Sequence, residues 1–324
     1  MLNSLMKIEV GLRRRLRERY DRTRTWNRVK LEFIWDLLLL SRTFRESRAK
    51  KKIPGARKDS EILNKKCGFG FLHILDKDYI EKVQEFAVSR KKLVQENIIG
   101  KSNSKEYLQQ IFDMSEVTQE SIFFLEGILK EDIVREISTY FGRKLPILHE
   151  ASIFYSPQRT KTEEQFQGSQ LFHRDGEGTK NLKIWILCEE TNLENGPTFL
   201  LDATNSEAIA REIDYIPGVK VLDQAVELTK NYKDAENFIA IGAKGTVFYT
   251  DTCRSFHYGS RTSNSASRLV AMFHFVENNS SYYFPYISRT FTSRLKPLNS
   301  DVQVWAKGNP LAQALLSKRI LYSK

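Results

Sequence analysis

Histidine and cysteine are both scarce in this 324-residue sequence, which holds five histidines and three cysteines. Cys67, Cys188 and Cys253 lie far apart and form no Cys-x-x-Cys pair. This usage argues against a disulfide framework and a structural zinc site, and it fits a reducing compartment. Cys253 lies four residues before His257 and could offer a metal ligand, but a small buried thiol is the preferred interpretation.

Long apolar runs are also missing, since no stretch reaches the roughly 18 apolar residues of a membrane-spanning helix. The longest candidate, residues 33–40, is short and contains Asp36. At the N-terminus arginines are interleaved with leucines, with no apolar core behind them, unlike a secretory signal peptide. Together with the cysteine usage, these absences predict a cytoplasmic protein.

Positive charge is concentrated near the N-terminus. Residues 1–66 hold 20 Lys/Arg and 8 Asp/Glu, a net of +12, whereas the other 258 residues hold 31 and 32, a net of −1. Apolar residues recur at three- and four-residue steps over residues 4–50, which predicts two amphipathic helices with an arginine-rich face. Residues 51–60, with Pro-Gly inside a charge run, indicate a linker. We therefore interpret residues 1–66 as a basic helical extension of a nearly neutral globular body.

The basic extension has three interpretations. The default is a solvated helical face that covers part of the core. The second is a peripheral surface for anionic membrane headgroups or nucleic acid. Sequence-specific nucleic-acid binding is not expected, because the extension lacks interleaved aromatic residues and any nucleic-acid-binding module. The third is an oligomerisation element that uses the apolar stripe of residues 29–44.

The order of the expected elements predicts the fold class. Helical periodicity over residues 76–94 and 115–142 comes first, and short β-rich runs separated by turn residues follow from about residue 145. One polar, helix-compatible insert, residues 206–233, interrupts them. Helices followed by five or more strands predict antiparallel sheets that close into a sandwich or barrel. The expected class is mainly β with flanking α.

The stretch LFHRDGEG, residues 171–178, contains a histidine and an aspartate separated by one residue. About 0.6 such pairs (5 × 40/324) arise by chance in this composition, so the pair alone decides little. In an extended segment, however, His173 and Asp175 point to the same face and can both face a barrel interior. A non-haem iron(II) oxygenase site then needs a second imidazole from another strand and open positions for cosubstrate and oxygen.

His257 and Arg268 are suited to complete such a site. His257 lies between two predicted strands, and Arg268 follows eleven residues later at the start of the second. A guanidinium there can hold a dicarboxylic cosubstrate through a bidentate salt bridge. Arg261 competes for this role, but its polar surroundings favour a solvated loop. His274 alternates with Arg268 along the strand and is interpreted as a core histidine rather than a fourth ligand.

The motif HRD, then NGP before an apolar strand, then a histidine with an arginine eleven residues later resembles the phytanoyl-CoA dioxygenase family. These are iron(II)- and 2-oxoglutarate-dependent oxygenases, and GFGFLHILDKDYIEKVQEF is similar to their opening strand and helix. The resemblance covers residues 67–290, the expected dioxygenase domain, and leaves residues 291–324 as a C-terminal extension. It implies a double-stranded β-helix (jelly-roll, cupin-like) core.

The resemblance also implies roles for four residues. His173, Asp175 and His257 would bind Fe(II), and Arg268 would bind the distal carboxylate of 2-oxoglutarate. Family members often place a serine two residues after the distal histidine, where this sequence has Gly259, followed by Ser260.

The implied activity is O2-dependent hydroxylation of a small or carrier-linked metabolite, with decarboxylation of 2-oxoglutarate to succinate. Because Asp175 is a carboxylate rather than Gly or Ala, no position is left for a halide, which favours hydroxylation over halogenation. Two alternatives are a jelly-roll protein that binds metal or sugar without turnover, and an interaction protein that acts through residues 1–66 on anionic lipid or nucleic acid.

Substrate-covering loops are expected at residues 97–104 and 206–233. Lys183 and Trp185 share one strand face, where they either line the pocket or serve ordinary packing.

Overall fold

The computed structural model describes residues 63, 66–99, 102–142, 144–159, 165–176, 180–277 and 297–316. All of them fall in one compact unit, which comprises Ile53–Ser280 and Lys296–Lys324. The helices and linker expected within residues 4–60 lie outside the described residues. The division of the chain at residues 66 and 290 stays a prediction.

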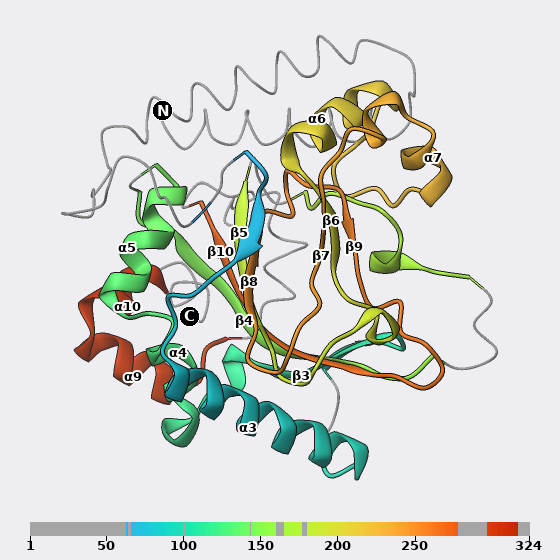
Figure 1. Ribbon diagram of the computed structural model, residues 1–324. Helices are drawn as coiled ribbons and strands as arrows, with labels where there is room; N and C mark the ends of the chain where they lie inside the picture. The colour runs from blue at the N-terminus through green and yellow to red at the C-terminus, as the bar shows by residue number, and fades with distance from the viewer. Residues whose placement is uncertain are drawn as a thin grey trace, which may run out of the picture. The chain divides into compact units, whose positions relative to one another are not determined.

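Two antiparallel sheets form the body of the described part (Figure 1). The large sheet has the order β1-β8-β5-β10-β4-β3-β2, and the small sheet has the order β7-β6-β9. Their strands are β1 Phe69–Phe71, β2 Ser102–Lys105, β3 Leu108–Asp113, β4 Ile147–Ser156, β5 Asn181–Leu187, β6 Phe199–Leu201, β7 Asn237–Ile239, β8 Val247–Thr250, β9 His257–Tyr258 and β10 Arg268–Val276. The predicted mainly β class with a jelly-roll core is confirmed.

Helices flank the sheets as expected. Figure 1 shows α3, α4, α5, α9 and α10 on the side of the large sheet that faces away from the small one, and α6 and α7 beside the small sheet. Their bounds are α3 Lys77–Gln95, α4 Phe123–Glu126, α5 Glu131–Tyr140, α6 Ala203–Glu212, α7 Asp223–Glu227, α9 Ser300–Gly308 and α10 Pro310–Leu315. The insert predicted at residues 206–233 is indeed helical, in α6 and α7.

The helix expected over residues 115–142, with one break, is more fragmented than predicted. The segment forms two 3-10 turns, Met114–Glu116 and Gln119–Ser121, before α4 and α5. Lys130 has an extended backbone with ψ 144° and precedes the first residue of α5, so α5 does not continue from α4. Apolar periodicity reports burial but not the turns between helices, which explains the error.

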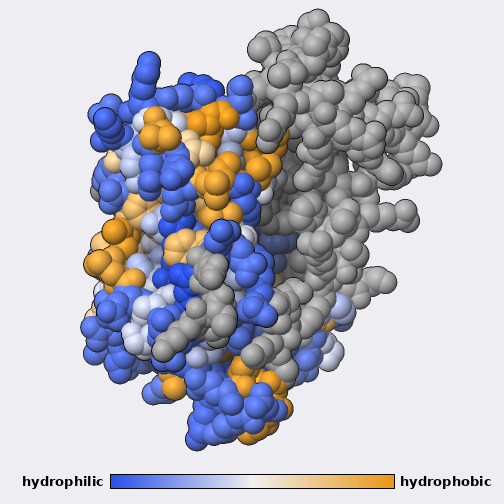
Figure 2. Space-filling model, turned by 90° about the vertical axis from the view of Figure 1, so that its right-hand side faces the viewer, coloured by the Kyte–Doolittle hydropathy of each residue, from blue (hydrophilic) through white to orange (hydrophobic). Residues whose placement is uncertain are grey.

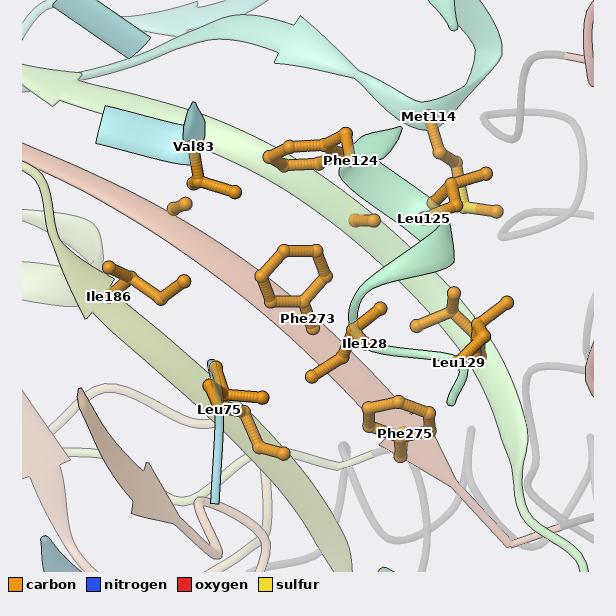
Figure 3. Packing of buried hydrophobic residues seen from close by; sticks show 14 of the residues in the cluster. Leu75, Val83, Met114, Phe124, Leu125, Ile128, Leu129, Ile186, Phe273 and Phe275 are labelled. Carbon is orange, nitrogen blue, oxygen red and sulfur yellow. The ribbon is translucent and has the colours of Figure 1, made fainter. Parts of the chain in front are cut away.

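The side chains of strand β10 alternate between the two faces of the large sheet. Leu269, Ala271, Phe273 and Phe275 belong to the main core cluster beneath the helices. In Figure 3, Phe273 lies among side chains that include Val83 of α3 and Phe124 of α4, and Phe275 lies near Ile128 and Leu129. Each such buried side chain stabilises the fold by about 1.5–3 kcal/mol relative to exposure. The alternate residues face the space between the sheets, where Val270 packs with Leu200 of β6.

The described part of the expected C-terminal extension packs against the same core. Leu298, Val302, Ala306, Ala312 and Leu315 all belong to the main cluster. The helices α9 and α10 therefore contribute directly to the outer layer over the large sheet.

Exposed apolar side chains include Val219, Leu222 and Leu228 near α7. Figure 2, which views the molecule from the side of α6 and α7, shows apolar patches interspersed with hydrophilic residues on the described surface. Scattered exposure of this kind is normal and identifies no docking surface. None of the helices in the described ranges is long and apolar enough to cross a membrane.

Candidate metal centre

Backbone pairing brings the predicted histidines side by side. His173 and His257 exchange two backbone hydrogen bonds, of 3.0 and 2.9 Å, in an antiparallel bridge. Two residues further on, the Asp175 amide donates to the Thr252 carbonyl at 2.8 Å. The segment that carries His173 and Asp175 therefore lies against both β9 and the segment that follows β8, and its two-residue period places both side chains on one face.

His173, Asp175 and His257 converge on one point. Their potential ligand atoms lie within 4.8 Å of one another. The two imidazole Nε2 atoms are 3.8 and 3.9 Å from the same oxygen, Asp175 Oδ1. Metal–ligand bonds of about 2.0–2.2 Å allow one ion to contact atoms at such separations. Within the described ranges, no other group of three His, Cys, Asp or Glu has this arrangement.

Both imidazoles are oriented by backbone carbonyls. His173 Nδ1 lies 2.9 Å from the Leu171 carbonyl oxygen, and His257 Nδ1 lies 3.1 Å from that of Ser255. Since a carbonyl accepts, Nδ1 carries the proton on each ring and Nε2 keeps its lone pair. Hydrogen bonds of this kind fix the tautomer and ring orientation of metal-binding histidines.

Burial keeps the two imidazoles neutral. Desolvation, together with the neighbouring imidazole, lowers the pKa of His173 to about 2. Desolvation lowers the pKa of His257 to about 4, and the nearby Lys183 ammonium acts in the same direction. A neutral imidazole is the form that binds a metal ion, so both rings are ready as ligands at neutral pH.

The two oxygens of the Asp175 carboxylate have different partners. Oδ1 faces the imidazoles, whereas Oδ2 accepts from Lys183 Nζ at 2.6 Å and from Thr252 Oγ1 at 2.5 Å. Burial alone would raise the pKa of Asp175, but Lys183 and the two histidines hold it well below its usual value. The carboxylate is therefore ionised. Lys183, which the sequence left open as a pocket or packing residue, directly contacts a candidate ligand.

Acid should destabilise the metal-free protein. His257 has a pKa of about 4 when folded and about 6.5 when unfolded, so below pH 6.5 the unfolded chain takes up a proton that the folded chain does not. At pH 5 this amounts to a loss of about 2 kcal/mol from His257 alone. Burial raises the pKa of Asp251 to about 6, which offsets part of the loss, since this group's contribution improves as pH falls. Urea unfolding with a chelator at pH 7.5 and pH 5.0 measures the balance; equal free energies of unfolding would contradict buried, neutral imidazoles.

Arg268 lies at the start of β10, between the sheets, and only 4% of its surface is exposed. Nη1 donates to Thr198 Oγ1 at 3.0 Å and Nη2 to Ser260 Oγ at 3.1 Å. Nε has no partner, and no salt bridge joins Arg268 to a carboxylate of the described residues. Desolvation lowers its pKa to about 10, with no neighbouring charge contributing. A buried guanidinium without a counter-ion is expensive, so this environment suits an anion.

Gly259 and Ser260 both lie beside the Arg268 guanidinium. A β-carbon on Gly259 would lie 3.5 Å from Arg268 Nη2, so this position borders the guanidinium. Ser260 has the left-handed φ of 63° and directs its hydroxyl to the same nitrogen. A serine therefore contacts the arginine from one residue later than the family pattern places it.

Arg261 was expected in a solvated loop, and that expectation is wrong. Its guanidinium forms a bidentate pair with Asp223 of α7, at 2.8 and 2.7 Å, and stacks 3.4 Å from the centre of the Tyr258 ring. Its Nε also donates to the Gln170 carbonyl at 2.7 Å. Through these contacts Arg261 connects α7 with Gln170, three residues before His173, and with Tyr258 of β9. Arg261 is thus already paired with a carboxylate, unlike Arg268.

Two further expectations concern buried residues near the centre. His274 is buried, lies 3.1 Å from Asn181 Nδ2 and packs edge-on against His149, so it is a core histidine outside the metal group. Cys253 is buried, forms no disulfide and also lies outside the metal group. Trp185 stacks on Phe248 and donates to Thr250.

Sequence reasoning missed Asn181 and Thr252. Asn181 Nδ2 donates to Thr252 Oγ1 at 2.9 Å, and Thr252 in turn donates to Asp175. A buried chain of hydrogen bonds therefore connects His274 with the candidate ligand. The sequence offered one signal for this contact, the polar Asn181 at the start of strand β5.

No protein-family model and no curated protein matches the chain. Among solved structures, it is similar to the non-heme alpha ketoglutarate dependent carbocyclase SnoK from nogalamycin biosynthesis, with TM-score 0.50 and 15% identity over 76% of this chain and 94% of that one. EctD from S. alaskensis with 2-oxoglutarate and 5-hydroxyectoine gives TM-score 0.47 and 15% identity over 70% and 83%. AviO1 from Streptomyces viridochromogenes Tue57 gives 0.45 and 11% over 66% and 92%. At 15% identity the likeness to SnoK establishes the fold alone, a double-stranded β-helix core.

Proposed function

We propose that the protein is an Fe(II)- and 2-oxoglutarate-dependent dioxygenase that hydroxylates a small or carrier-linked metabolite. The convergence of His173, Asp175 and His257 between the sheets of a jelly roll carries this proposal. The similarity of the fold to that of SnoK, a non-heme alpha ketoglutarate dependent carbocyclase, supports it. Three points stay predictions: membership of the phytanoyl-CoA dioxygenase family, the cytoplasmic location and the role of residues 1–66.

The donor set fits Fe(II). Two neutral imidazoles and one carboxylate form the facial arrangement that non-haem iron oxygenases use, with open positions for other ligands. A structural zinc site, in contrast, is closed by four protein ligands, commonly including thiolates. Cys253, the nearest thiol in sequence, does not belong to the metal group. We therefore assign His173, Asp175 and His257 as the iron ligands.

The environment of Arg268 fits a dicarboxylate. Its guanidinium is buried, pairs with no carboxylate of the described residues and has no hydrogen-bond partner for Nε among them. It projects from β10 into the same space between the sheets that holds the metal group. A bidentate pair with one carboxylate of 2-oxoglutarate would neutralise it and leave the keto acid end of that molecule for the metal.

When bound, Fe(II) with 2-oxoglutarate supplies O2 activation coupled to decarboxylation of the keto acid to succinate. The protein's part is to orient and to exclude water. Leu171 and Ser255 carbonyls fix the imidazoles, and Arg268 fixes the cosubstrate. The presence of Asp175 as a ligand leaves no position for a halide, which favours hydroxylation over halogenation.

Anaerobic titration of the metal-free protein with Fe(II), and then with 2-oxoglutarate, tests the proposal. We expect the weak visible charge-transfer band of a chelated keto acid, and we expect it to be absent from His173→Ala. Under O2, succinate should then form. Iron binding without the band would indicate a metal-binding jelly roll without turnover, and binding of neither would refute the assignment of these residues.

A further inference from the structure

The lysine beside the candidate metal ligand requires an explanation. Lys183 lies in β5, where Asn181 is the only other polar residue, opposite His274 of β10. The Lys183 and Asp175 side chains are 14% and 13% exposed, so the pair is largely removed from water. Burial of a lysine is costly unless its charge is compensated, and here the compensating group is a carboxylate assigned to the metal.

The contact with Lys183 makes the two oxygens of the Asp175 carboxylate different from each other. Lys183 and Thr252 both donate to Oδ2, at 2.6 and 2.5 Å, whereas Oδ1 is the oxygen nearest both imidazole Nε2 atoms. An oxygen that already accepts two strong hydrogen bonds, one of them from an ammonium group, is a poor second ligand for a cation. Only Oδ1 is then presented to the metal.

We propose that Lys183 is a positioning residue that restricts Asp175 to one metal-facing oxygen and offsets the charge of its carboxylate, favouring the anionic cosubstrate over tight metal binding. This inference rests on the proposed function and concerns the relative affinities of the same site for Fe(II) and for 2-oxoglutarate. With the lysine present, the carboxylate leaves a coordination position vacant for the keto acid. The ammonium also attracts the dianionic cosubstrate and repels the metal ion.

Lys183→Met separates these effects from simple destabilisation. Without the ammonium we expect Fe(II), titrated anaerobically by calorimetry, to bind about tenfold more tightly, because a repulsive charge is gone. We expect 2-oxoglutarate, titrated through its charge-transfer band, to bind about tenfold more weakly, because an attractive charge is lost and Oδ2 is free to occupy a metal position. A merely structural lysine would change both affinities in the same direction. Lys183→Arg, which can still donate to Oδ2, should restore both.

Lys91→Met is the matched control. Lys91 Nζ contacts Glu189 Oε1 at 2.7 Å with a side chain 15% exposed, so the substitution removes a similar pair from α3, outside the metal group. It should leave both affinities at wild-type values. If Lys183→Met fails to fold, Thr252→Val removes the other donor to Oδ2 without a change in charge, and it should weaken 2-oxoglutarate severalfold with no gain in iron affinity.

The outcomes distinguish this inference from the proposed function. Wild-type protein that binds neither Fe(II) nor 2-oxoglutarate overturns both. Wild-type binding with unchanged affinities in the Lys183 or Thr252 variants overturns the inference alone, as does a parallel loss of both affinities. Opposite shifts in Lys183→Met, absent from Lys91→Met and reversed in Lys183→Arg, support it.

Discussion

Arg268→Met is expected to make the metal-free protein more stable while it abolishes 2-oxoglutarate binding. Desolvation lowers the pKa of Arg268 from 12.5 to about 10, and no carboxylate within the described ranges offsets this. A shift of that size corresponds to an unfavourable contribution of up to about 3 kcal/mol at neutral pH. Methionine fills a similar volume without the charge, so much of that cost should be recovered. Urea unfolding of both proteins with a chelator measures the difference.

The same variant should lose its response to the cosubstrate. With Fe(II) bound, wild-type protein should gain about 2.7 kcal/mol of stability at 2-oxoglutarate concentrations 100 times its dissociation constant. Arg268→Met should retain Fe(II) and gain almost nothing, because the guanidinium proposed to hold the distal carboxylate is gone.

Arg261→Met provides the comparison for this experiment. It breaks the bidentate pair with Asp223 and should destabilise the protein, yet it should still bind 2-oxoglutarate. The reverse pattern, with normal 2-oxoglutarate binding in Arg268→Met and loss of it in Arg261→Met, would transfer the anchoring role to Arg261.

The candidate metal group could be predicted because its pattern is local. The two-residue period of an extended chain places His173 and Asp175 on one face, and the β10 alternation likewise separates Arg268 and His274 from Phe273 and its helix-facing neighbours. Only the pairing of His173 with His257 had to be supplied by the fold. The jelly-roll core followed from the order of helices and strands and from the family resemblance.

The surroundings of the metal group could not be predicted, because they depend on register between distant strands. Lys183 reaches Asp175 from β5, and Thr252 reaches it from the turn after β8. A shift of one residue in either strand would turn these side chains to the opposite face. The pairing of Arg261 with Asp223 likewise depends on where α7 packs, which no sequence period reports.

Asp175→Ala should lose the metal and also destabilise the metal-free protein strongly. Removal of one partner of a buried ion pair leaves the other uncompensated, at a typical cost of about 3–5 kcal/mol. Here the charge that loses its Asp175 partner is that of Lys183, whose side chain is 14% exposed. His257→Ala should lose the metal as well, but it leaves the Asp175–Lys183 pair intact. Chelator-treated Asp175→Ala should therefore be much less stable than chelator-treated His257→Ala, although both fail to bind Fe(II).

The double variant Asp175→Ala/Lys183→Met tests the cause of that loss. If the uncompensated ammonium is responsible, the second substitution should restore most of the stability without restoring metal binding, and the double-mutant cycle should show a large coupling energy. The corresponding cycle on Lys91 and Glu189, a pair in which the carboxylate is 32% exposed, should show a smaller coupling. A double variant as unstable as Asp175→Ala alone would mean that Asp175 stabilises the apo fold through Thr252 and its backbone bond, and not through Lys183. Recovery of stability without recovery of metal binding would separate the contribution of the Asp175–Lys183 pair to the fold from the proposed role of Asp175 as a metal ligand.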